Sequence, residues 1–453
     1  MADTIAAVAT GGALCAIGIV RLSGDDAVGV ADRVFFPASG RKMSEYADRK
    51  LVYGELRDEK GAVLDMGLCT ISRGPGSYTG EDTAELQLHG SPVVLGECLR
   101  LLFRMGARQA LAGEFTKRAF LNGRMDLTQA EAVIDLIHAE TPEGAYLAAD
   151  QLGGALLRRV EPVYGAMTDI MSHFHAVLDY PDEEIEDFQL DAYAGQLEEI
   201  RDALRSLLGS FERGRLVRSG VRCAIVGKPN VGKSSILNAL LGYERAIVTD
   251  IPGTTRDTIE ERIRLGGVLL RLADTAGIRE TDDTVENIGV RRSYRAAEEA
   301  GLVLAVFDGS RSLSPEDEAV LQAAAGKKTI ALVNKSDLSG RLDEAALRGR
   351  FDHVVRVSAL DGSGFDELEE LIKSLFPTGD SCGAVLTNER QAGAVSRALE
   401  SVEAALDAVR GHVTPDAALC EVESAMSALG ELTGRTVRED ITARIFERFC
   451  VGK

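Results

Sequence analysis

The stretch 227–234, GKPNVGKS, constrains the fold of this chain more than any other. It has the form G-x-x-x-x-G-K-[ST] and stands between a short apolar run, 223–226, and a helical pattern, 235–241. Glycines at both ends of the turn let successive N–H groups and the positive end of the helix face one anion. Lys233 can reach the β and γ phosphates of a nucleotide, and the Ser234 hydroxyl can ligate Mg²⁺. The stretch predicts a phosphate-binding loop, the P-loop, unless the match is a coincidence.

Three further motifs argue against coincidence, because each follows an apolar run that is predicted to be a strand. DTAG (274–277) follows 269–273, NKSD (334–337) follows 330–333, and SAL (358–360) follows 354–357. Ligands bind open α/β sheets at the carboxyl ends of the strands, so the motifs predict one site. Asp274 can hold Mg²⁺ through water, and the Gly277 N–H can bind the γ-phosphate. Asp337 can accept two N–H donors from guanine, whereas adenine offers the wrong pattern. The motifs therefore predict a GTPase.

The predicted GTP-binding residues come from these motifs and from the segment 249–257, TDIPGTTRD, which lies between the P-loop and DTAG. They are Asn230, Val231, Gly232, Lys233, Ser234, Ser235, Thr249, Asp250, Ile251, Pro252, Gly253, Thr254, Thr255, Asp274, Thr275, Ala276, Gly277, Asn334, Lys335, Ser336, Asp337, Ser358, Ala359 and Leu360. Either Thr254 or Thr255 can coordinate Mg²⁺ when the γ-phosphate orders this segment.

The residue after DTAG bears on the mechanism of hydrolysis. Ras-type sites have a glutamine there that orients the attacking water, but this chain has Ile278. Another residue must orient the water, and the acidic candidates lie in 279–289. Spacing identifies no arginine finger. A monovalent cation can replace one, and the Asn230 amide with oxygens of Thr249, Ile251 and Thr254 can hold it.

The region 1–118 predicts a compact α+β domain. Short β-like runs lie at 4–9, 16–22, 50–56, 62–72 and 83–88, and a helical pattern lies at 92–105. In the last run Glu85, Gln87 and His89 alternate with two leucines, so one strand face carries hydrogen-bonding groups. The alternative is an ordinary half-buried strand whose polar face is exposed to solvent and has no binding role.

Helical periodicity dominates the regions on either side of the P-loop domain. Helical patterns lie at 127–137, 145–178, 192–211, 388–409, 416–432 and 438–449, and Asp126 with Gln129 is a credible amino-terminal cap. The simplest architecture is a discontinuous helical domain, 119–216 and 381–453, with an α/β P-loop domain, 217–380, inserted between its halves. Loops at 209–219 and 377–384 are the expected hinges.

Composition limits the class of protein. The formal net charge of -20 argues against coating of nucleic acid by bulk attraction. The seven cysteines are scattered without a C-x-x-C pair, which favours reduced thiols and a cytoplasmic location. No segment approaches the length and apolarity of a membrane span.

The chain resembles the MnmE (TrmE) family, GTPases of tRNA wobble-uridine modification. The resemblance rests on GEFTKRAFLNGRMDLTQAEAVIDLI (113–137), GKPNVGKSS, GTTRD, DTAGIRETDDTVENIG and the terminal FCVGK, and it covers nearly the whole chain. It implies an N-terminal domain that dimerises and binds 5-formyl- or 5,10-methylene-tetrahydrofolate, and Ras-like G domains that approach each other in a K⁺-dependent way. It also implies a heterotetramer with the FAD-containing flavoprotein MnmG. Together they would add an aminomethyl or carboxymethylaminomethyl group to C5 of the wobble uridine in the tRNA anticodon loop.

The resemblance also assigns site residues by motif. The implied folate contacts are Arg21, Glu85, Arg124 and Lys453; the implied Mg²⁺ ligands are Ser234 and Thr255; the implied K⁺ ligands are Asn230, Thr249, Ile251 and Thr254. Glu286 is the implied hydrolytic residue and Arg279 a switch residue. Cys450 matches the family's terminal cysteine, for which the alternatives are a catalytic or substrate-positioning thiol and a buried thiol at a helix end. One departure is GGALCAIG (11–18), where the family usually has a proline-glycine loop.

Two rival functions follow from the same motifs. A ribosome-assembly GTPase shares them and the apolar residue after DTAG, but a basic RNA-binding appendage would be expected beside it. The second rival is a nucleotide-gated scaffold in which hydrolysis only resets a dimer. The state of the wobble uridine in cells lacking the protein discriminates both.

Overall fold

The structure is a computed structural model that describes residues 3–11, 13–179, 190–243, 261–273, 296–377, 385–411, 413–436, 445–447 and 449–452. The chain groups into two compact units. Unit 1 comprises Met1–Ile137, Gln151–Leu204 and Gly393–Lys453; unit 2 comprises His138–Asp150 and Arg205–Ala392. The division into three domains at the boundaries given above stays a prediction.

The amino-terminal part of unit 1 is a seven-stranded sheet in the order β3-β4-β5-β6-β2-β1-β7. Its strands are antiparallel except for the parallel pair β1 and β7. The strands are β1 (Ile5–Val8), β2 (Ile17–Ser23), β3 (Phe35–Pro37), β4 (Val52–Arg57), β5 (Val63–Ser72), β6 (Thr83–His89) and β7 (Arg108–Gln109). The accompanying helices are α1 (Ala27–Val34), the short η1 (Met43–Glu45), α2 (Pro92–Arg104) and α3 (Glu114–Leu121).

One face of this sheet packs on α1 and α2. Val20, Leu22 and Leu86 point to that side and join one buried apolar cluster with both helices. Because side chains alternate along a strand, Arg21 and Glu85 lie on the opposite face. The five predicted strands and the predicted helix α2 are confirmed within one or two residues. The helices α1 and α3 were not predicted, since each is only eight residues long.

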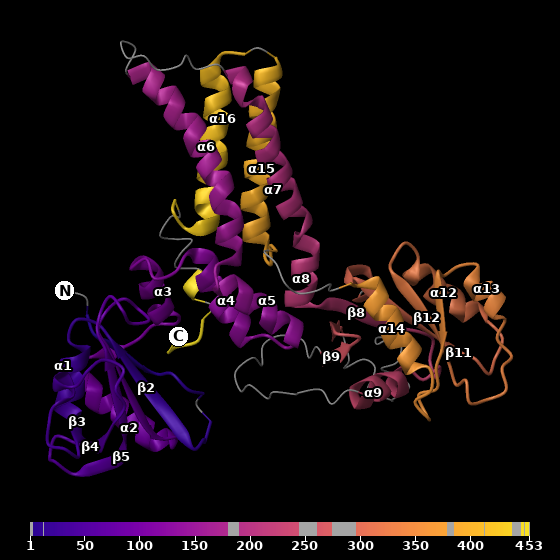
Figure 1. Ribbon diagram of the computed structural model, residues 1–453. Coiled ribbons are helices and arrows are strands. Elements are labelled where there is room, and N and C mark those ends of the chain that lie inside the picture. The colour runs from indigo at the N-terminus through magenta and orange to yellow at the C-terminus, as the bar shows by residue number, and fades with distance from the viewer. Residues whose placement is uncertain are drawn as a thin grey trace. The chain divides into compact units, whose positions relative to one another are not determined.

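The helical part of unit 1 joins segments from both ends of the chain. Figure 1 shows α6 and α7 beside α15 and α16, which follow some 200 residues later in the sequence. Glu198 of α7 pairs with Arg410 of α15 (2.8 Å), and Glu161 of α6 pairs with Arg435 just after α16 (2.8 Å). The helices are α4 (Leu127–Ile137), α6 (Ala155–Asp179), α7 (Ala194–Gly209), α15 (Glu389–Arg410) and α16 (Pro415–Thr433), with the short η2 (Leu190–Tyr193).

Local predictions in the helical regions have mixed outcomes. The Asp126 cap of α4 is confirmed, because its carboxylate accepts from the Gln129 N–H (3.0 Å) while the Gln129 side chain accepts from the Asp126 N–H. The helical pattern predicted over 145–178 is confirmed as helix, but it is interrupted. It is split into α5 (Pro142–Leu152) and α6 by two glycines, of which Gly154 has φ +80°. The expected hinge loop at 209–219 is wrong, since α8 (Phe211–Ser219) occupies it. The other expected hinge and the pattern at 438–449 lie largely outside the described residues.

Unit 2 holds a six-stranded sheet in the order β13-β12-β11-β8-β10-β9. All neighbouring strands are parallel except β9 and β10. The strands are β8 (Val221–Val226), β9 (Glu261–Leu265), β10 (Val268–Leu272), β11 (Leu302–Asp308), β12 (Thr329–Asn334) and β13 (His353–Arg356). The helices are α5, α8, α9 (Lys233–Tyr243), α12 (Pro315–Ala324), α13 (Glu344–Arg348) and α14 (Phe365–Leu375).

Both faces of this sheet are buried. Ile225 and Leu304 belong to a cluster with α9 and α14, whereas Val226 and Ala305 belong to a second cluster with α12 on the other face. The predicted strands β8, β10, β12 and β13 are all confirmed. The edge strand β9 was not predicted, because it alternates charged residues with apolar ones over only five positions.

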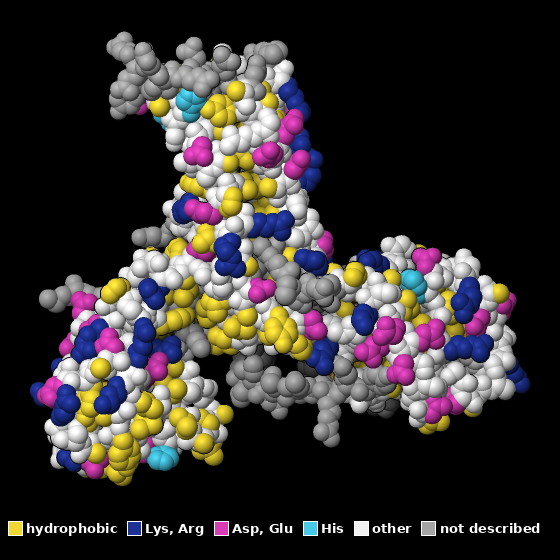
Figure 2. Space-filling view, viewed as in Figure 1, with side chains coloured by type: hydrophobic (Ala, Val, Ile, Leu, Met, Phe, Trp, Pro, Cys, Tyr) yellow, Lys and Arg dark blue, Asp and Glu magenta, His cyan; other side chains and the backbone are white. Residues whose placement is uncertain are grey.

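Charged side chains of both signs lie on the face of the molecule seen in Figure 2. Figure 2 shows basic and acidic side chains next to one another over most of the visible face, rather than a single basic field. Among the described residues, no helix is long and apolar enough to cross a bilayer.

Candidate functional site

The P-loop leaves β8 and enters α9 with a backbone that glycine makes possible. Gly232 has φ +95°, and a Cβ there would clash with the side-chain amide of Asn334. A Cβ at Gly227 would lie 2.7 Å from the Val306 carbonyl oxygen. Asn230 adopts φ +62°, a left-handed conformation that costs free energy in a residue other than glycine. The loop therefore needs support from its surroundings.

Two side chains of the NKSD motif supply part of that support. The Asn334 Nδ2 group donates to the Val231 carbonyl (2.8 Å), and the Lys335 ammonium donates to the Asn230 carbonyl (3.0 Å). Lys335 also pairs with Asp308, the last residue of β11 (2.7 Å). Burial opposes ionisation of Asp308, but hydrogen bonds from Lys335 and Ser310 outweigh it and lower the pKa of this carboxyl. The motif predicted to read guanine thus also holds the phosphate loop.

Lys233, the lysine of the P-loop pattern, makes defined contacts within the loop. Its ammonium donates to the carbonyl oxygens of Gly227 and Lys228, both at 2.9 Å. Ser234 and Ser235 follow it in the first turn of α9, where backbone N–H groups lack intrahelical acceptors. This arrangement can bind a phosphate group through backbone amides, the helix dipole and one ammonium group.

The loops after β12 and β13 meet as the sequence predicts. The Ser358 hydroxyl donates to Asp337 (2.9 Å), and the Ala359 N–H donates to the Asn334 side-chain oxygen (3.2 Å). Ser336 donates its N–H to the Val357 carbonyl (3.2 Å), while Leu360 is largely exposed. These contacts bring NKSD and SAL to the P-loop at one edge of the sheet.

Several predicted residues lie outside the described residues, so their places are untested. They are Thr249, Asp250, Ile251, Pro252, Gly253, Thr254, Thr255, Asp274, Thr275, Ala276, Gly277, Arg279, Glu286 and Lys453. Of the predicted cation ligands, Asn230 and Ser234 lie in the described P-loop, which supplies a side-chain amide and a hydroxyl oxygen to that end of the site. Such oxygen donors suit Mg²⁺ and K⁺.

A second group of predicted residues meets in unit 1. The register pairs Arg21 of β2 with Glu85 of β6, and their side chains form an ion pair of 2.8 Å. The Arg21 guanidinium lies 5.6 Å from the Tyr78 ring centroid and 5.8 Å from that of Phe115. Both charged side chains remain partly exposed, at 21% for Arg21 and 29% for Glu85, so a ligand can reach them.

The carboxyl terminus lies against the strand beside Arg21. Val451 bridges to Ala112, the Gly113 N–H donates to the Cys450 carbonyl (3.3 Å), and Gly452 is packed against the Val8 carbonyl. Lys453 is the next residue. Cys450 is exposed, so the alternative of a buried thiol is wrong. The Arg124 side chain is exposed and its stem packs beside Gly80, in the loop that carries Tyr78.

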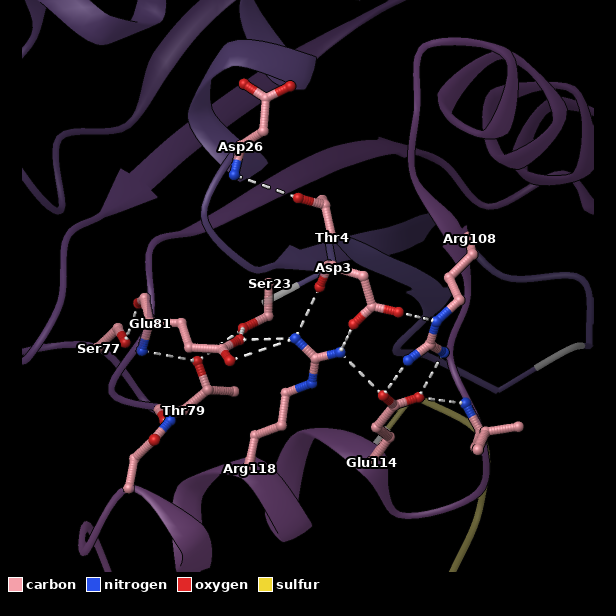
Figure 3. Close-up of polar contacts among 12 residues, drawn as sticks. Asp3, Thr4, Ser23, Asp26, Ser77, Thr79, Glu81, Arg108, Glu114 and Arg118 are labelled. Atoms are coloured by element: carbon pink, nitrogen blue, oxygen red, sulfur yellow. Dashed lines mark hydrogen bonds and ion pairs between the residues drawn. The ribbon is translucent and has the colours of Figure 1, made fainter. Parts of the chain in front are cut away.

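A network of charged side chains, centred on the buried Arg118, fixes this region, and the sequence analysis missed it (Figure 3). Arg118 of α3 pairs with Asp3 (2.7 Å), Glu81 (3.0 Å) and Glu114 (2.9 Å), and its side chain is only 10% exposed. Arg108 pairs with Asp3 and Glu114 as well. The network ties the chain before β1, the loop 77–82 and α3 together. Its partners lie up to 115 residues apart, which no local pattern reveals.

Comparisons with known proteins agree with this architecture. Residues 4–124 match the family described as GTP-binding protein TrmE N-terminus, and residues 127–450 match the MnmE helical domain. A tRNA modification GTPase MnmE of Alkaliphilus metalliredigens is 43% identical, with 100% of this chain and 99% of that protein covered. One of Clostridioides difficile is 42% identical over the same shares.

The chain belongs to the MnmE family. Membership confirms the resemblance drawn from the motifs, and it fits the observed amino-terminal, helical and P-loop parts. Among solved structures, Era of Aquifex aeolicus bound to GDP and AlF4⁻ is 29% identical and covers 40% of this chain and 66% of its own. Its TM-score of 0.28 is too low to support an inference.

The charge network predicts an acid-sensitive fold of the amino-terminal sheet. Burial opposes the charged form of Glu114, but hydrogen bonds from Arg108, the Leu111 N–H and Arg118 outweigh it and lower its pKa from 4.5 to about 2. Since the folded-state pKa is depressed, the stabilisation is present above pH 4.5 and is lost as the pH falls towards 2. Glu114→Gln should destabilise this region at pH 7 by on the order of 3 kcal/mol and flatten its response between those pH values.

Hydrogen exchange of β1 and α3, followed from pH 7 to pH 3, measures this effect. Glu97→Gln is the matched control, because Glu97 has an exposed ion pair with Arg100 that should contribute little. Equal protection of β1 and α3 in the two variants at pH 7 would refute a stabilising role for the network.

Proposed function

We propose that the protein is a K⁺-stimulated GTPase that acts with the FAD-containing MnmG partner in tRNA modification. It would add an aminomethyl or carboxymethylaminomethyl group to C5 of the wobble uridine in the anticodon loop, using a one-carbon tetrahydrofolate. The observation that carries the GTPase assignment is the contact of Asn334 and Lys335 with the P-loop carbonyls, which joins a guanine-type loop to a phosphate loop. Family membership over the whole chain carries the tRNA assignment.

The predicted residues of the nucleotide site have separate roles in this proposal. Lys233 would leave the two loop carbonyls and bind the β and γ phosphates, and Ser234 would supply its hydroxyl oxygen to Mg²⁺. Asp337, held by Ser358 through one oxygen, accepts the guanine N–H donors with its carboxylate. Asn230, Thr249, Ile251 and Thr254 would hold K⁺, and Thr255 would be a further Mg²⁺ ligand. Bound Mg²⁺ and K⁺ supply positive charge to the phosphoryl oxygens, and Glu286 orients the attacking water.

The face of the amino-terminal sheet is proposed as the folate site. Arg21 engages one carboxylate oxygen of Glu85, which keeps the other available for the donor edge of a pterin. Arg124 and Lys453 supply positive charge for the carboxylates of the folate tail. Support comes from the packing of Gly452 against Val8, which brings the terminus to the strand next to β2.

The remaining features of the proposal concern assembly. The amino-terminal domain (1–118) dimerises, and the inserted G domains (217–380) of two subunits approach each other during hydrolysis. The discontinuous helical domain (119–216 and 381–453) connects these parts in a cytoplasmic heterotetramer with MnmG. Two further residues have roles outside assembly. Arg279 acts in the switch segment after DTAG, and Cys450 takes part in the tRNA-modifying reaction.

Mass spectrometry of wobble uridine in cells lacking the protein tests the function as a whole. Loss of the C5 modification with normal ribosomal subunits is expected. Normal ribosomal subunits alone would not establish the proposal. Defective subunits together with a normally modified wobble uridine would favour the ribosome-assembly GTPase. Normal uridine and normal subunits would favour the scaffold.

Hydrolysis should depend on K⁺ and on one carboxylate. Steady-state GTPase rates in K⁺ should exceed those in Na⁺ at least tenfold, because K⁺ neutralises charge that an arginine finger would otherwise meet. Glu286→Ala should lose at least 100-fold in kcat with nearly unchanged GTP affinity. Glu280→Ala, in the same segment, is the control and should retain activity. Equal rates in both salts, or full activity of Glu286→Ala, would contradict these assignments.

Folate binding should depend on the Arg21 and Glu85 pair. In calorimetry on the full chain, Glu85→Ala should weaken 5-formyl-tetrahydrofolate binding roughly 10- to 100-fold, as expected for hydrogen bonds to a charged group. Glu55→Ala on β4, whose carboxylate pairs with Arg57, should bind like the unaltered protein. Unchanged affinity of Glu85→Ala would place the folate elsewhere.

A further inference from the structure

Lys228, the second residue of the P-loop, has an unassigned set of contacts. The G-x-x-x-x-G-K-[ST] pattern leaves its identity open, and its side chain is directed towards the start of α12. Its ammonium group lies 2.7 Å from an Asp317 carboxylate oxygen and 3.0 Å from the Ser314 hydroxyl. The pair is nearly buried, with 14% of the Lys228 side chain and 3% of the Asp317 side chain exposed.

The acceptor side of this pair is built into the helix. Ser314 and Asp317 form the capping box of α12, in which the same Asp317 oxygen accepts from the Ser314 N–H (2.8 Å). A carboxylate this deeply buried requires a partner, since an unpaired charge would be costly. The ion pair therefore fastens one backbone position of the P-loop to a fixed helix terminus.

The two halves of the P-loop are held in different ways. Asn334 and Lys335 hold the second half, through the carbonyls of Val231 and Asn230. Lys233 holds the first half, through the carbonyls of Gly227 and Lys228. When Lys233 turns to a bound phosphate, those two carbonyls lose its ammonium group. The Lys228 side chain can keep its contacts with α12 during that change.

We propose that Lys228 is a positioning residue of the nucleotide site, whose ion pair with Asp317 keeps the first half of the P-loop in its phosphate-binding shape while Lys233 is engaged with phosphate. This inference rests on the proposed nucleotide binding. It explains why a lysine reaches from the phosphate loop to a helix cap instead of to solvent. Loss of the ion pair should lower the affinity for GDP, because part of the binding free energy must then be used to order the P-loop.

Release of a fluorescent GDP analogue from the full chain, measured by stopped flow, tests the proposal. Lys228→Met should speed release about tenfold, and Lys228→Arg, which can still pair with Asp317, should restore it to within threefold. Glu318→Gln is the matched control, because it removes the ion pair between α12 and Arg350 (3.0 Å) without touching the P-loop. It should leave release unchanged.

A double variant separates positioning from stability. Lys228→Met with Asp317→Asn leaves no unpaired buried charge, so its thermal midpoint should recover relative to Lys228→Met while GDP release stays fast. Release that returns to the original rate together with the midpoint would overturn the proposal, as would unchanged release in Lys228→Met. Absence of GDP binding by the unaltered protein would instead refute the proposed nucleotide function.

Discussion

The side-chain amide of Asn334 joins two loops that come from distant parts of the chain. It is 2% exposed, donates to the Val231 carbonyl in the P-loop, and accepts from the Ala359 N–H in the loop after β13. A buried amide that is satisfied on both sides fixes the distance between the groups it joins. A phosphate site and a base site are thereby held in register, and the predicted roles of the neighbouring motifs depend on this arrangement.

The parallel sheet explains why one amide can reach both loops. The neighbouring strands β8, β11, β12 and β13 run in the same direction, so the loops that follow them emerge at one edge. In unit 1 the antiparallel sheet achieves a comparable result by register, since it sets Arg21 opposite Glu85. In both sheets, the direction and register of the paired strands fix where groups that are distant in the sequence lie, so these groups come together.

The sequence alone predicted what local patterns encode. Apolar runs marked the strands of the P-loop sheet, and polar motifs after them marked its functional edge. Two glycines interrupt the predicted helical pattern at 153–154, and one prediction was wrong, because α8 occupies an expected hinge. The Arg118 network and the Lys228 pair could not be predicted, because Arg118 and Asp3 are 115 residues apart and Lys228 and Asp317 are 89 apart. Such contacts depend on tertiary packing, which no short pattern records.

The central claim is that this edge of the sheet binds a guanine nucleotide. Competition of GTP and ATP for a fluorescent GDP analogue on the purified full chain tests it most directly. With Asp337 held by Ser358 to read guanine, GTP should compete at least 100-fold better than ATP, because adenine does not offer the two N–H donors that the Asp337 carboxylate accepts from guanine. Equal competition by the two nucleotides would contradict the account.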